Sequence, residues 1–234
     1  MNTGNLKQPS SSESFNELIN LNKELSKRNI ELENALDEKE ILLKEIFHKF
    51  KNNLMVISSL LNLQSRYIKD KKALEIFQKS QNRAKTMALI YEKLYQSSDI
   101  KKINFGEYIQ SATNDIFYLN DLDLITPNLN VENIMLDINF VAPLGLILNE
   151  LICNCIKHAF PHGMVGNITI NFHKTNGKYE LIVKDDGIGF PDDLDYKDTN
   201  SLGLRLVNML VDQIDGTIKV INDNGTTFTI YFKE

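Results

Sequence analysis

The chain has 234 residues, of which 42% are hydrophobic and 24% charged, a composition typical of a protein with one large domain or two small ones. Its net charge of −5 argues against general binding to nucleic acid, which requires a basic surface. We expect no signal peptide and no membrane span, because no apolar run is long enough. Cys153 and Cys155 fall on different faces of one expected helix, which excludes a local disulfide and fits a reducing, cytoplasmic compartment.

The N-terminal part of the chain predicts a tail and then a long helix. Residues 1–14 are polar and are expected to form a disordered tail. Residues 15–41 contain no Gly or Pro, and their leucines follow a heptad-like spacing at Leu18, Leu21, Leu25 and Leu32. This pattern favours a parallel coiled coil. The alternative is a single amphipathic helix packed on its own chain.

Residues 42–100 predict a helical hairpin. Apolar side chains line one stripe of its first helix, at Leu43, Phe47, Phe50, Leu54, Ile57 and Leu61. His48 lies roughly opposite that stripe and should face outward. The second helix is expected from about residue 73 to 96, with an apolar side formed by Leu74, Phe77, Ala84, Ala88, Tyr91 and Tyr95. A lone hairpin cannot bury both apolar faces, so we expect a homodimer in which two hairpins form a four-helix bundle.

Residues 101–234 predict a second, mixed region. Helices are expected over residues 105–119, 141–160 and 202–214, and strands over residues 130–138, 167–172, 179–185, 216–222 and 226–232. The turn sequence "NDNG" predicts a hairpin between the last two strands. Alternation of helices and strands together with hairpins indicates a mixed sheet. The fold class is therefore α+β, with an α/β sandwich following the helical region.

The segment "NELICNCIKHAF" places polar side chains at helical spacing. Glu150 and Asn154 are four residues apart and share a helix face, and Lys157 lies three residues further on. An amide oxygen of Asn154 can ligate Mg²⁺ while phosphates supply the other oxygens, and Lys157 can neutralise phosphate charge. By itself, the segment is better explained as a few polar residues on the solvent side of a core helix.

The segment "VKDDGIGFP" ends a strand on a carboxylate. Asp185 is placed to accept a hydrogen bond from the exocyclic amine of adenine, which guanine cannot offer, so the site would select ATP over GTP. Gly187 and Gly189 allow the backbone to approach a ligand closely. Gly203 opens a helix whose N-terminus can receive phosphate, and Thr226 begins a strand in "NGTTF". The alternative for the first of these segments is a hairpin turn.

Together, these segments resemble the motifs of histidine kinases. Residues 101–234 resemble the ATP-binding catalytic domain of histidine kinases and related ATPases, with the N box "NELICNCIKHAF", the glycine boxes "DDGIGF" and "SLGL", and the last motif "GTTF". Residues 42–100 resemble the dimerisation and phosphoacceptor domain of the second histidine kinase A subfamily. The matching segments there are "LLKEIFHKFKNNLMVISSLLNLQSRYI" and "SQNRAKTMALIYEKLYQS".

This resemblance implies an ATP-dependent protein histidine kinase of a two-component system. His48 would accept the γ-phosphoryl group of ATP and pass it to an aspartate in the receiver domain of a response regulator. Asn154 would hold Mg²⁺, Asp185 would read adenine, and Glu150 would support the metal site. The nucleotide pocket and its lid would be shaped by Gly187, Gly189 and Gly203.

Two residues beside His48 are assigned roles from their spacing on the helix. Glu45, one turn before, is placed to hold the N–H of one ring nitrogen and so fix the tautomer. Asn52, one turn after, is placed to orient water that dephosphorylates the regulator. The family usually has a histidine and an arginine where Phe47 and Lys49 stand. Phe47 lies on the apolar stripe, so its presence leaves His48 as the acceptor.

Two rival functions share these features. One is a phosphotransfer or scaffold protein with an inactive ATP domain, against which the complete nucleotide motifs argue. The other is an ATPase or protein serine kinase of the same ATP-binding fold, against which the histidine-bearing hairpin argues. Labelling with ATP separates all three.

Overall fold

The computed structural model describes residues 11–96, 102–119, 124–190 and 202–233, and the chain divides into two units, Met1–Glu45 and Ile46–Glu234. Helix α1 (Ser11–Ser65) begins in the first unit, so residues 11–14 of the expected tail are helical, and residues 1–10 lie outside the described residues. The heptad leucines Leu18, Leu21, Leu25 and Leu32 are all exposed. The coiled coil stays a prediction, and these exposed leucines are what a second copy would cover.

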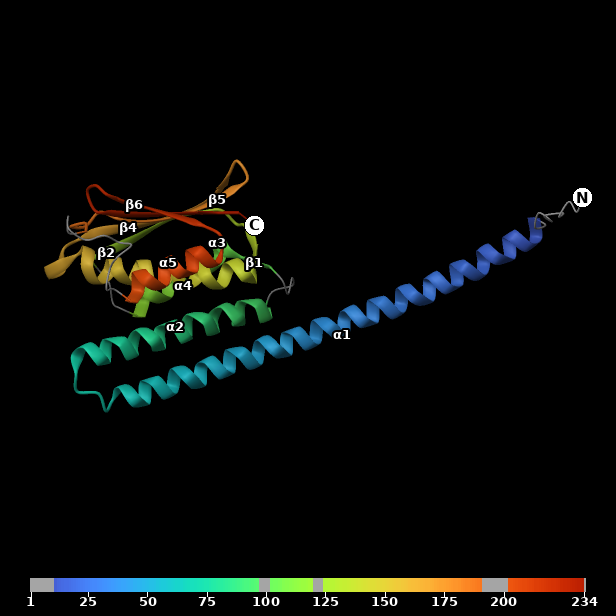
Figure 1. The fold of residues 1–234 in the computed structure, drawn as a ribbon, viewed down its shortest axis with the longest axis horizontal. Coiled ribbons are helices and arrows are strands. Elements are labelled where there is room, and N and C mark those ends of the chain that lie inside the picture. Colours follow the sequence, from blue (N-terminus) through green and yellow to red (C-terminus); the bar gives the residue numbers. More distant parts are fainter. Residues whose placement is uncertain (1–10, 97–101, 120–123, 191–201, 234) are drawn as a thin grey trace, which may run out of the picture. The chain divides into compact units, whose positions relative to one another are not determined.

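In the second unit, the end of α1 and helix α2 (Lys71–Gln96) form the expected antiparallel hairpin (Figure 1). The ring of Tyr91 lies 6.0 Å from that of Phe47 and 5.3 Å from that of Phe50, measured between centroids. Lys51 Nζ on α1 lies 2.6 Å from Glu92 Oε1 on α2. These contacts place Phe47 on the inner side of the hairpin, and His48 is exposed as expected, but Phe50 and Ile57 of the predicted stripe are exposed as well.

Helix α2 buries a second face against the α/β region of its own chain, which we did not predict from the sequence. Ile90 is fully buried in the core of the α/β region, and its Cδ1 packs against Gly145. Part of the apolar surface expected to require a partner is therefore covered within one chain. Helix α1 still exposes Met55, Val56, Ile57, Leu60 and Leu63, so the predicted dimer depends chiefly on this helix.

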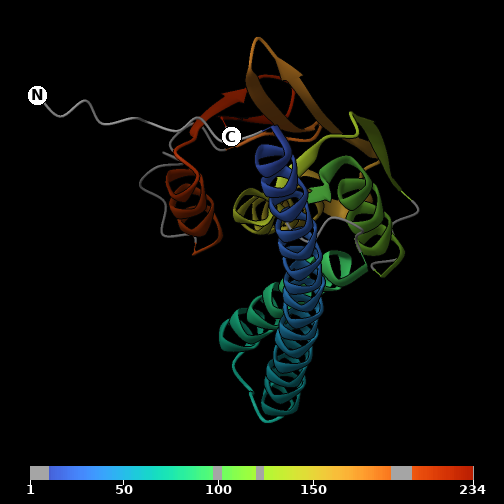
Figure 2. The same cartoon turned by 90° about the vertical axis from the view of Figure 1, so that its right-hand side faces the viewer.

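The α/β region is built on a five-stranded mixed sheet. Its strands are β2 (Ile125–Val131), β4 (Gly166–Thr175), β5 (Lys178–Asp185), β6 (Thr217–Asn222) and β7 (Thr226–Phe232). Their order is β2-β4-β5-β7-β6, with β2 parallel to β4 and the other neighbours antiparallel. Helices α3 (Phe105–Leu119), α4 (Ile138–Asn154) and α5 (Leu202–Gln213) lie on one face (Figure 2). The mixed-sheet expectation is confirmed.

The prediction of a single strand over residues 130–138 is wrong. The chain instead forms two strands in different sheets, β2 in the large sheet and β3 (Met135–Asp137), which pairs with β1 (Lys102–Asn104). Pro127 hides β2 in the sequence, because a proline has no backbone N–H to donate. The sheet tolerates it because β2 is an edge strand.

Helix α4 begins three residues earlier than expected. Asp137 caps it, with Oδ1 accepting the N–H of Asn139 at 2.8 Å. After Asn154 the chain continues in a π-helical turn, Cys155–Ala159, and then a short 3₁₀ turn, Pro161–Gly163. A π turn holds more residues than an α turn, so the faces predicted from α-helical spacing shift beyond Asn154.

The segment Ile138–Ala159 bears on the expectation that the chain contains no membrane span. With 22 residues and a mean hydropathy of 1.5, it is long and apolar enough to cross a membrane, contrary to the expectation that no segment reaches that length. However, α4 lies beneath the sheet, and residues such as Leu144, Ile147, Leu148 and Leu151 are fully or almost fully buried in the core. Its apolar character is therefore explained by packing within the domain.

Candidate active site

A cavity of about 510 Å³ opens between the end of α4, the ends of β5 and β7, and α5. It is lined by Asn154, Cys155, His158, Ala159, Asp185, Ile188, Gly189, Phe190, Leu204, Thr226 and Phe228. Most of these walls are apolar, with few polar groups, which suits a planar heteroaromatic ring. Four of the residues predicted from the sequence meet here: Asn154, Asp185, Gly189 and Thr226.

Asp185 forms the polar floor of the cavity. Its side chain is 3% exposed, and Oδ1 accepts the backbone N–H groups of Gly187 and Thr226, each at 3.1 Å. Oδ2 accepts the thiol proton of Cys155 at a sulfur–oxygen distance of 3.5 Å. Burial, and then the nearby Asp185 carboxylate, raises the pKa of the Cys155 thiol well above its usual range. Cys155 therefore stays protonated, and Asp185 keeps an acceptor for a ligand donor.

The glycines are required by close backbone approaches. A Cβ on Gly187 would overlap with the carbonyl oxygen of Ala159, which accepts the N–H of Ile188 at 3.0 Å. Gly189 has φ +73°, and its Cβ would overlap with Oδ1 of Asn222. That same Oδ1 accepts the N–H of Phe190 at 2.8 Å. These hydrogen bonds hold the loop after β5 against the end of α4 and against β6.

Replacing Gly189 by alanine is expected to weaken nucleotide binding about tenfold or more, since the strained φ and the overlap with Asn222 displace the cavity wall at Phe190. Gly177→Ala is the matched control, because Gly177 also has a positive φ, +76°, but has open space around its Cβ position. Titration with a fluorescent ATP analogue measures both. Equal effects of the two substitutions would contradict the proposed role of the loop.

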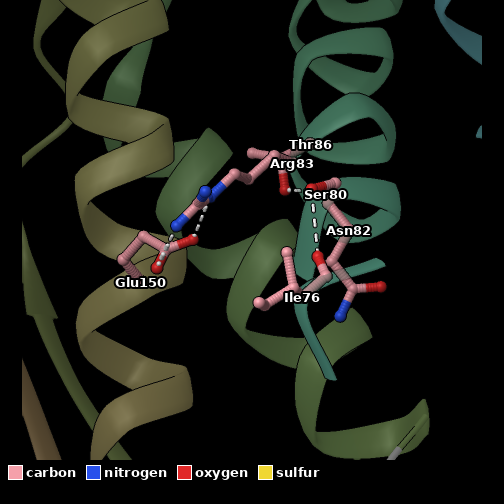
Figure 3. Close-up of polar contacts among 6 residues, drawn as sticks. All are labelled: Ile76, Ser80, Asn82, Arg83, Thr86 and Glu150. Carbon is pink, nitrogen blue, oxygen red and sulfur yellow. Dashed lines mark hydrogen bonds and ion pairs between the residues drawn. The ribbon is translucent and has the colours of Figure 1, made fainter. Parts of the chain in front are cut away.

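Two predicted site residues do not line the cavity. Glu150 is on α4, where its carboxylate forms a bidentate ion pair with Arg83 of α2, with nitrogen–oxygen distances of 2.8 and 3.0 Å (Figure 3). Lys157 is exposed on the π turn. The remaining predicted glycine, Gly203, is buried in the first turn of α5, next to Leu204 of the cavity wall.

His158 lines the cavity, although no role was assigned to it from the sequence. Partial burial, followed by the ammonium groups of Lys79 and Lys157, lowers the pKa of its imidazole. The ring is therefore neutral at pH 7 and can donate a hydrogen bond to a ligand without carrying charge. The sequence signal that could have indicated this position is its spacing of four residues from Asn154, which places the two side chains on one helix face.

The proposed phosphoacceptor lies on the hairpin. His48 is exposed, its Nδ1 lies 3.4 Å from Asn52 Nδ2, and its ring centroid lies 5.6 Å from that of Tyr95 on α2. Asn52 therefore contacts the imidazole directly, whereas the role of Glu45, at the end of the first unit, stays a prediction. Tyr95 belongs to the predicted apolar side of α2, but no sequence pattern indicated its contact with His48.

The residues at the cavity could supply only a few of the ligands of a Mg²⁺ ion. Asn154 offers an amide oxygen at the cavity, and Asp185 already accepts three hydrogen bonds. Within the described parts of the chain, no group of three or more His, Cys, Asp or Glu side chains could hold a metal ion. A magnesium ion here would therefore take most of its ligands from phosphate and water, as is usual for this metal.

Comparison with known proteins adds two domain assignments. Residues 45–120 match the family described as histidine kinase, and residues 141–234 match the histidine kinase-, DNA gyrase B-, and HSP90-like ATPases. Among curated proteins, the sensor histidine kinase PdtaS of Mycobacterium tuberculosis is 30% identical over 190 residues, covering 79% of this chain and 37% of that protein. The blue-light-activated histidine kinase 2 of Erythrobacter litoralis is 25% identical over 193 residues, covering 80% of this chain and 55% of that protein.

Solved structures agree on the fold. The histidine kinase domain of the Erythrobacter litoralis EL346 blue-light activated histidine kinase superimposes with a TM-score of 0.64 at 21% identity, covering 81% of this chain and 94% of that one. The chain spans about two fifths to about half the length of the curated relatives it matches. The chain belongs to the histidine kinase family, with a histidine kinase domain followed by a histidine kinase-, DNA gyrase B-, and HSP90-like ATPase domain.

Proposed function

We propose that the chain transfers the γ-phosphoryl group of ATP to His48 and then to an aspartate in the receiver domain of a response regulator. The observation that carries this proposal is the buried carboxylate of Asp185, held by two backbone N–H groups at the floor of an otherwise apolar cavity. An exposed imidazole in the same chain supplies the acceptor.

In the proposed reaction, the adenine amine donates to Asp185 and the ring lies among the apolar walls. Asn154 would help to hold Mg²⁺, which would neutralise charge on the phosphates. A lone pair on one ring nitrogen of His48 forms the new N–P bond as the bond between the γ-phosphorus and the bridging oxygen breaks. ADP leaves, and the imidazole loses its remaining proton to solvent. In transfer to the receiver domain, a carboxylate oxygen of the acceptor aspartate forms a bond to the phosphorus as the N–P bond breaks, and the imidazole regains a proton from solvent.

Asn52 and Glu45 are proposed to have different roles beside His48. The contact of Asn52 with Nδ1 supports a role close to the reacting ring, and its amide is placed to orient water toward a docked phosphoaspartate. Asn52→Ala should slow regulator dephosphorylation, and Glu45→Gln should slow autophosphorylation by weakening control of the tautomer. Assays with a purified receiver domain measure both rates. An unchanged rate in either variant would remove the role of that residue.

We also propose a cytoplasmic homodimer. The exposed apolar residues of α1 and the heptad leucines support association with a second copy, and both cysteines are free, as expected in a reducing compartment. The stimulus and the identity of the regulator are matters for the whole protein.

The deciding experiment is incubation of the purified chain with Mg²⁺ and ATP labelled at the γ-phosphate. We expect label on the protein that is lost in acid and stable in base, as a phosphohistidine would be. Phosphate released without protein labelling would favour an ATPase, and acid-stable label would favour a serine kinase. ATP binding absent altogether would favour a scaffold with an inactive ATP domain.

A further inference from the structure

The side chain of Asn222 makes a two-point contact with the loop after β5. Asn222 is the last residue of β6, it is exposed, and it does not line the cavity. Its Oδ1 accepts the backbone N–H of Phe190 at 2.8 Å, and its Nδ2 donates to the carbonyl oxygen of Phe190 at 2.9 Å. One carboxamide therefore satisfies both backbone groups of a single residue, as a neighbouring antiparallel strand does.

The residue that Asn222 holds forms part of the cavity wall. Phe190 lines the cavity together with Phe228 of β7, and the two rings meet edge to face, with centroids 5.9 Å apart and an interplanar angle of 69°. A Cβ at the preceding residue, Gly189, would overlap with Asn222 Oδ1, so the two-point contact requires glycine there. Phe190 is therefore held at its backbone by Asn222 and at its ring by Phe228.

The turn between β6 and β7, residues 222–226, also holds the floor of the cavity. Asn222 pairs with Thr226 across this turn, and the backbone N–H of Thr226 donates to Asp185 Oδ1 at 3.1 Å. Gly225 has φ +103°, and a Cβ on it would overlap with the carbonyl oxygen of Asp185. The β6–β7 turn thus contacts the floor through its backbone and the wall through one side chain, that of Asn222.

The parts of the cavity held by the β6–β7 turn are those proposed to bind the base. Asp185 is the proposed reader of adenine, and the rings of Phe190 and Phe228 are apolar surfaces suited to a purine. Asn154, which is proposed to help hold Mg²⁺ beside the phosphates, is at the end of α4 instead. A change at Asn222 should therefore act on binding of the base and not on binding of the phosphates.

We propose that Asn222 is a positioning residue for the nucleotide base: its carboxamide holds Phe190 as a wall of the cavity and so sets the affinity for adenine nucleotides, whatever their number of phosphates. This inference rests on the proposed binding of ATP in the cavity. Asn222 acts on the ligand through Phe190, because it does not line the cavity itself. It controls affinity, whereas the choice of adenine over guanine depends on Asp185.

Asn222→Ala tests the proposal, because it removes both hydrogen bonds to Phe190. We expect the affinities for ATP, ADP and AMP to fall by the same factor, about tenfold, with the ratio of ATP to GTP affinity within about twofold of wild type. Calorimetric titration measures these affinities. Asn130→Ala is the control, since Asn130 is exposed on β2 at the opposite edge of the sheet, and it should bind as wild type does. Unchanged affinities, or a larger loss for ATP than for AMP, would overturn the proposal.

Asn222→Asp adds a pH dependence that a merely structural role would not produce. At neutral pH, one oxygen of the new carboxylate can accept the N–H of Phe190, but the other faces the carbonyl oxygen of Phe190 and is repelled by it. This repulsion raises the pKa of the new carboxyl while Phe190 is held in place. The protonated form donates to the carbonyl oxygen, as Nδ2 does in the wild type. The two-point contact is therefore present below the raised pKa and is lost as the pH rises through it.

The ATP affinity of Asn222→Asp should thus rise several-fold from about pH 7.5 to about pH 5, relative to that of Asn224→Asp. Asn224→Asp adds the same charge within the β6–β7 turn, at a side chain that donates to Asp223 and not to the loop after β5. Titration of ATP, of Asp223 and of His158 affects both variants, so it cancels in the ratio of their affinities. A ratio that does not change with pH would overturn the proposal.

These binding measurements separate failure of the inference from failure of the proposed function. If the wild-type chain binds none of the adenine nucleotides, the proposed function fails and the inference fails with it. If the wild type binds ATP and Asn222→Ala binds it equally well, only the inference fails. Thermal unfolding followed by circular dichroism shows whether Asn222→Ala is folded. If it is not, the ratio of Asn222→Asp to Asn224→Asp decides in its place.

Discussion

Replacing His48 by glutamine is expected to abolish acid-labile labelling from ATP, reducing the rate by more than about 10⁴-fold, as removal of an essential nucleophile does in other enzymes. Glutamine keeps a polar side chain on the exposed face of α1 but offers no lone pair of comparable nucleophilicity. Affinity for ATP should stay unchanged, because His48 is not among the residues that line the cavity. Labelling rate and ATP binding are measured on the same preparation.

His173→Gln is the matched control for this experiment. His173 is in β4, where its Nε2 lies 2.6 Å from Oε2 of Glu180 on the neighbouring strand, and it lies outside both the cavity and the hairpin. It should label as wild type does. Label that persists in the His48 variant would identify a different acceptor and would support the serine kinase alternative.

Replacing Asp185 by asparagine is expected to lower affinity for ATP by a factor of about 100 or more. A hydrogen bond to a charged group contributes about 1.5–3 kcal/mol, and the new amide N–H would also face the adenine amine donor and the Cys155 thiol. The preference for ATP over GTP should shrink in the same variant. Calorimetric titration with both nucleotides measures the two effects together.

Asp186→Asn provides the comparison one residue along the chain. Asp186 accepts the backbone N–H of Asn167 at 2.6 Å and its side-chain amide at 2.7 Å, and it does not line the cavity. This variant should lower stability without changing nucleotide preference. If Asp185→Asn retained ATP affinity within about twofold, the assignment of Asp185 as the adenine reader would have to be withdrawn.

Local patterns identified the floor of the cavity well. The alternation in residues 179–185 predicts a strand ending on Asp185, and the strand β5 ends at that residue with its carboxylate buried. The glycines after it were predicted from their spacing, and each avoids an overlap that a side chain would create. Strand alternation and glycine spacing are local patterns, which is why they were visible in the sequence, whereas the atoms that these glycines avoid belong to the distant residues Ala159 and Asn222.

Features that depend on distant contacts were not visible. Arg83 and Glu150 are 67 residues apart, and nothing in "NELICNCIKHAF" shows that Glu150 faces α2. Lys157, expected near the face of Asn154, does not line the cavity, because the π turn that follows Asn154 shifts the face from that of an α-helix, and nothing in the sequence indicated this turn. Pro127 concealed an edge strand for the same reason that it can occupy one.

The way in which Asp185 is held has a consequence for base selection. Backbone amides of Gly187 and Thr226 orient the carboxylate before any nucleotide arrives, so the acceptor is preorganised. An incoming purine encounters an oxygen that cannot rotate away, and little conformational entropy is lost on binding at this point. In the proposed function, discrimination between adenine and guanine would therefore start from an acceptor that is already in place.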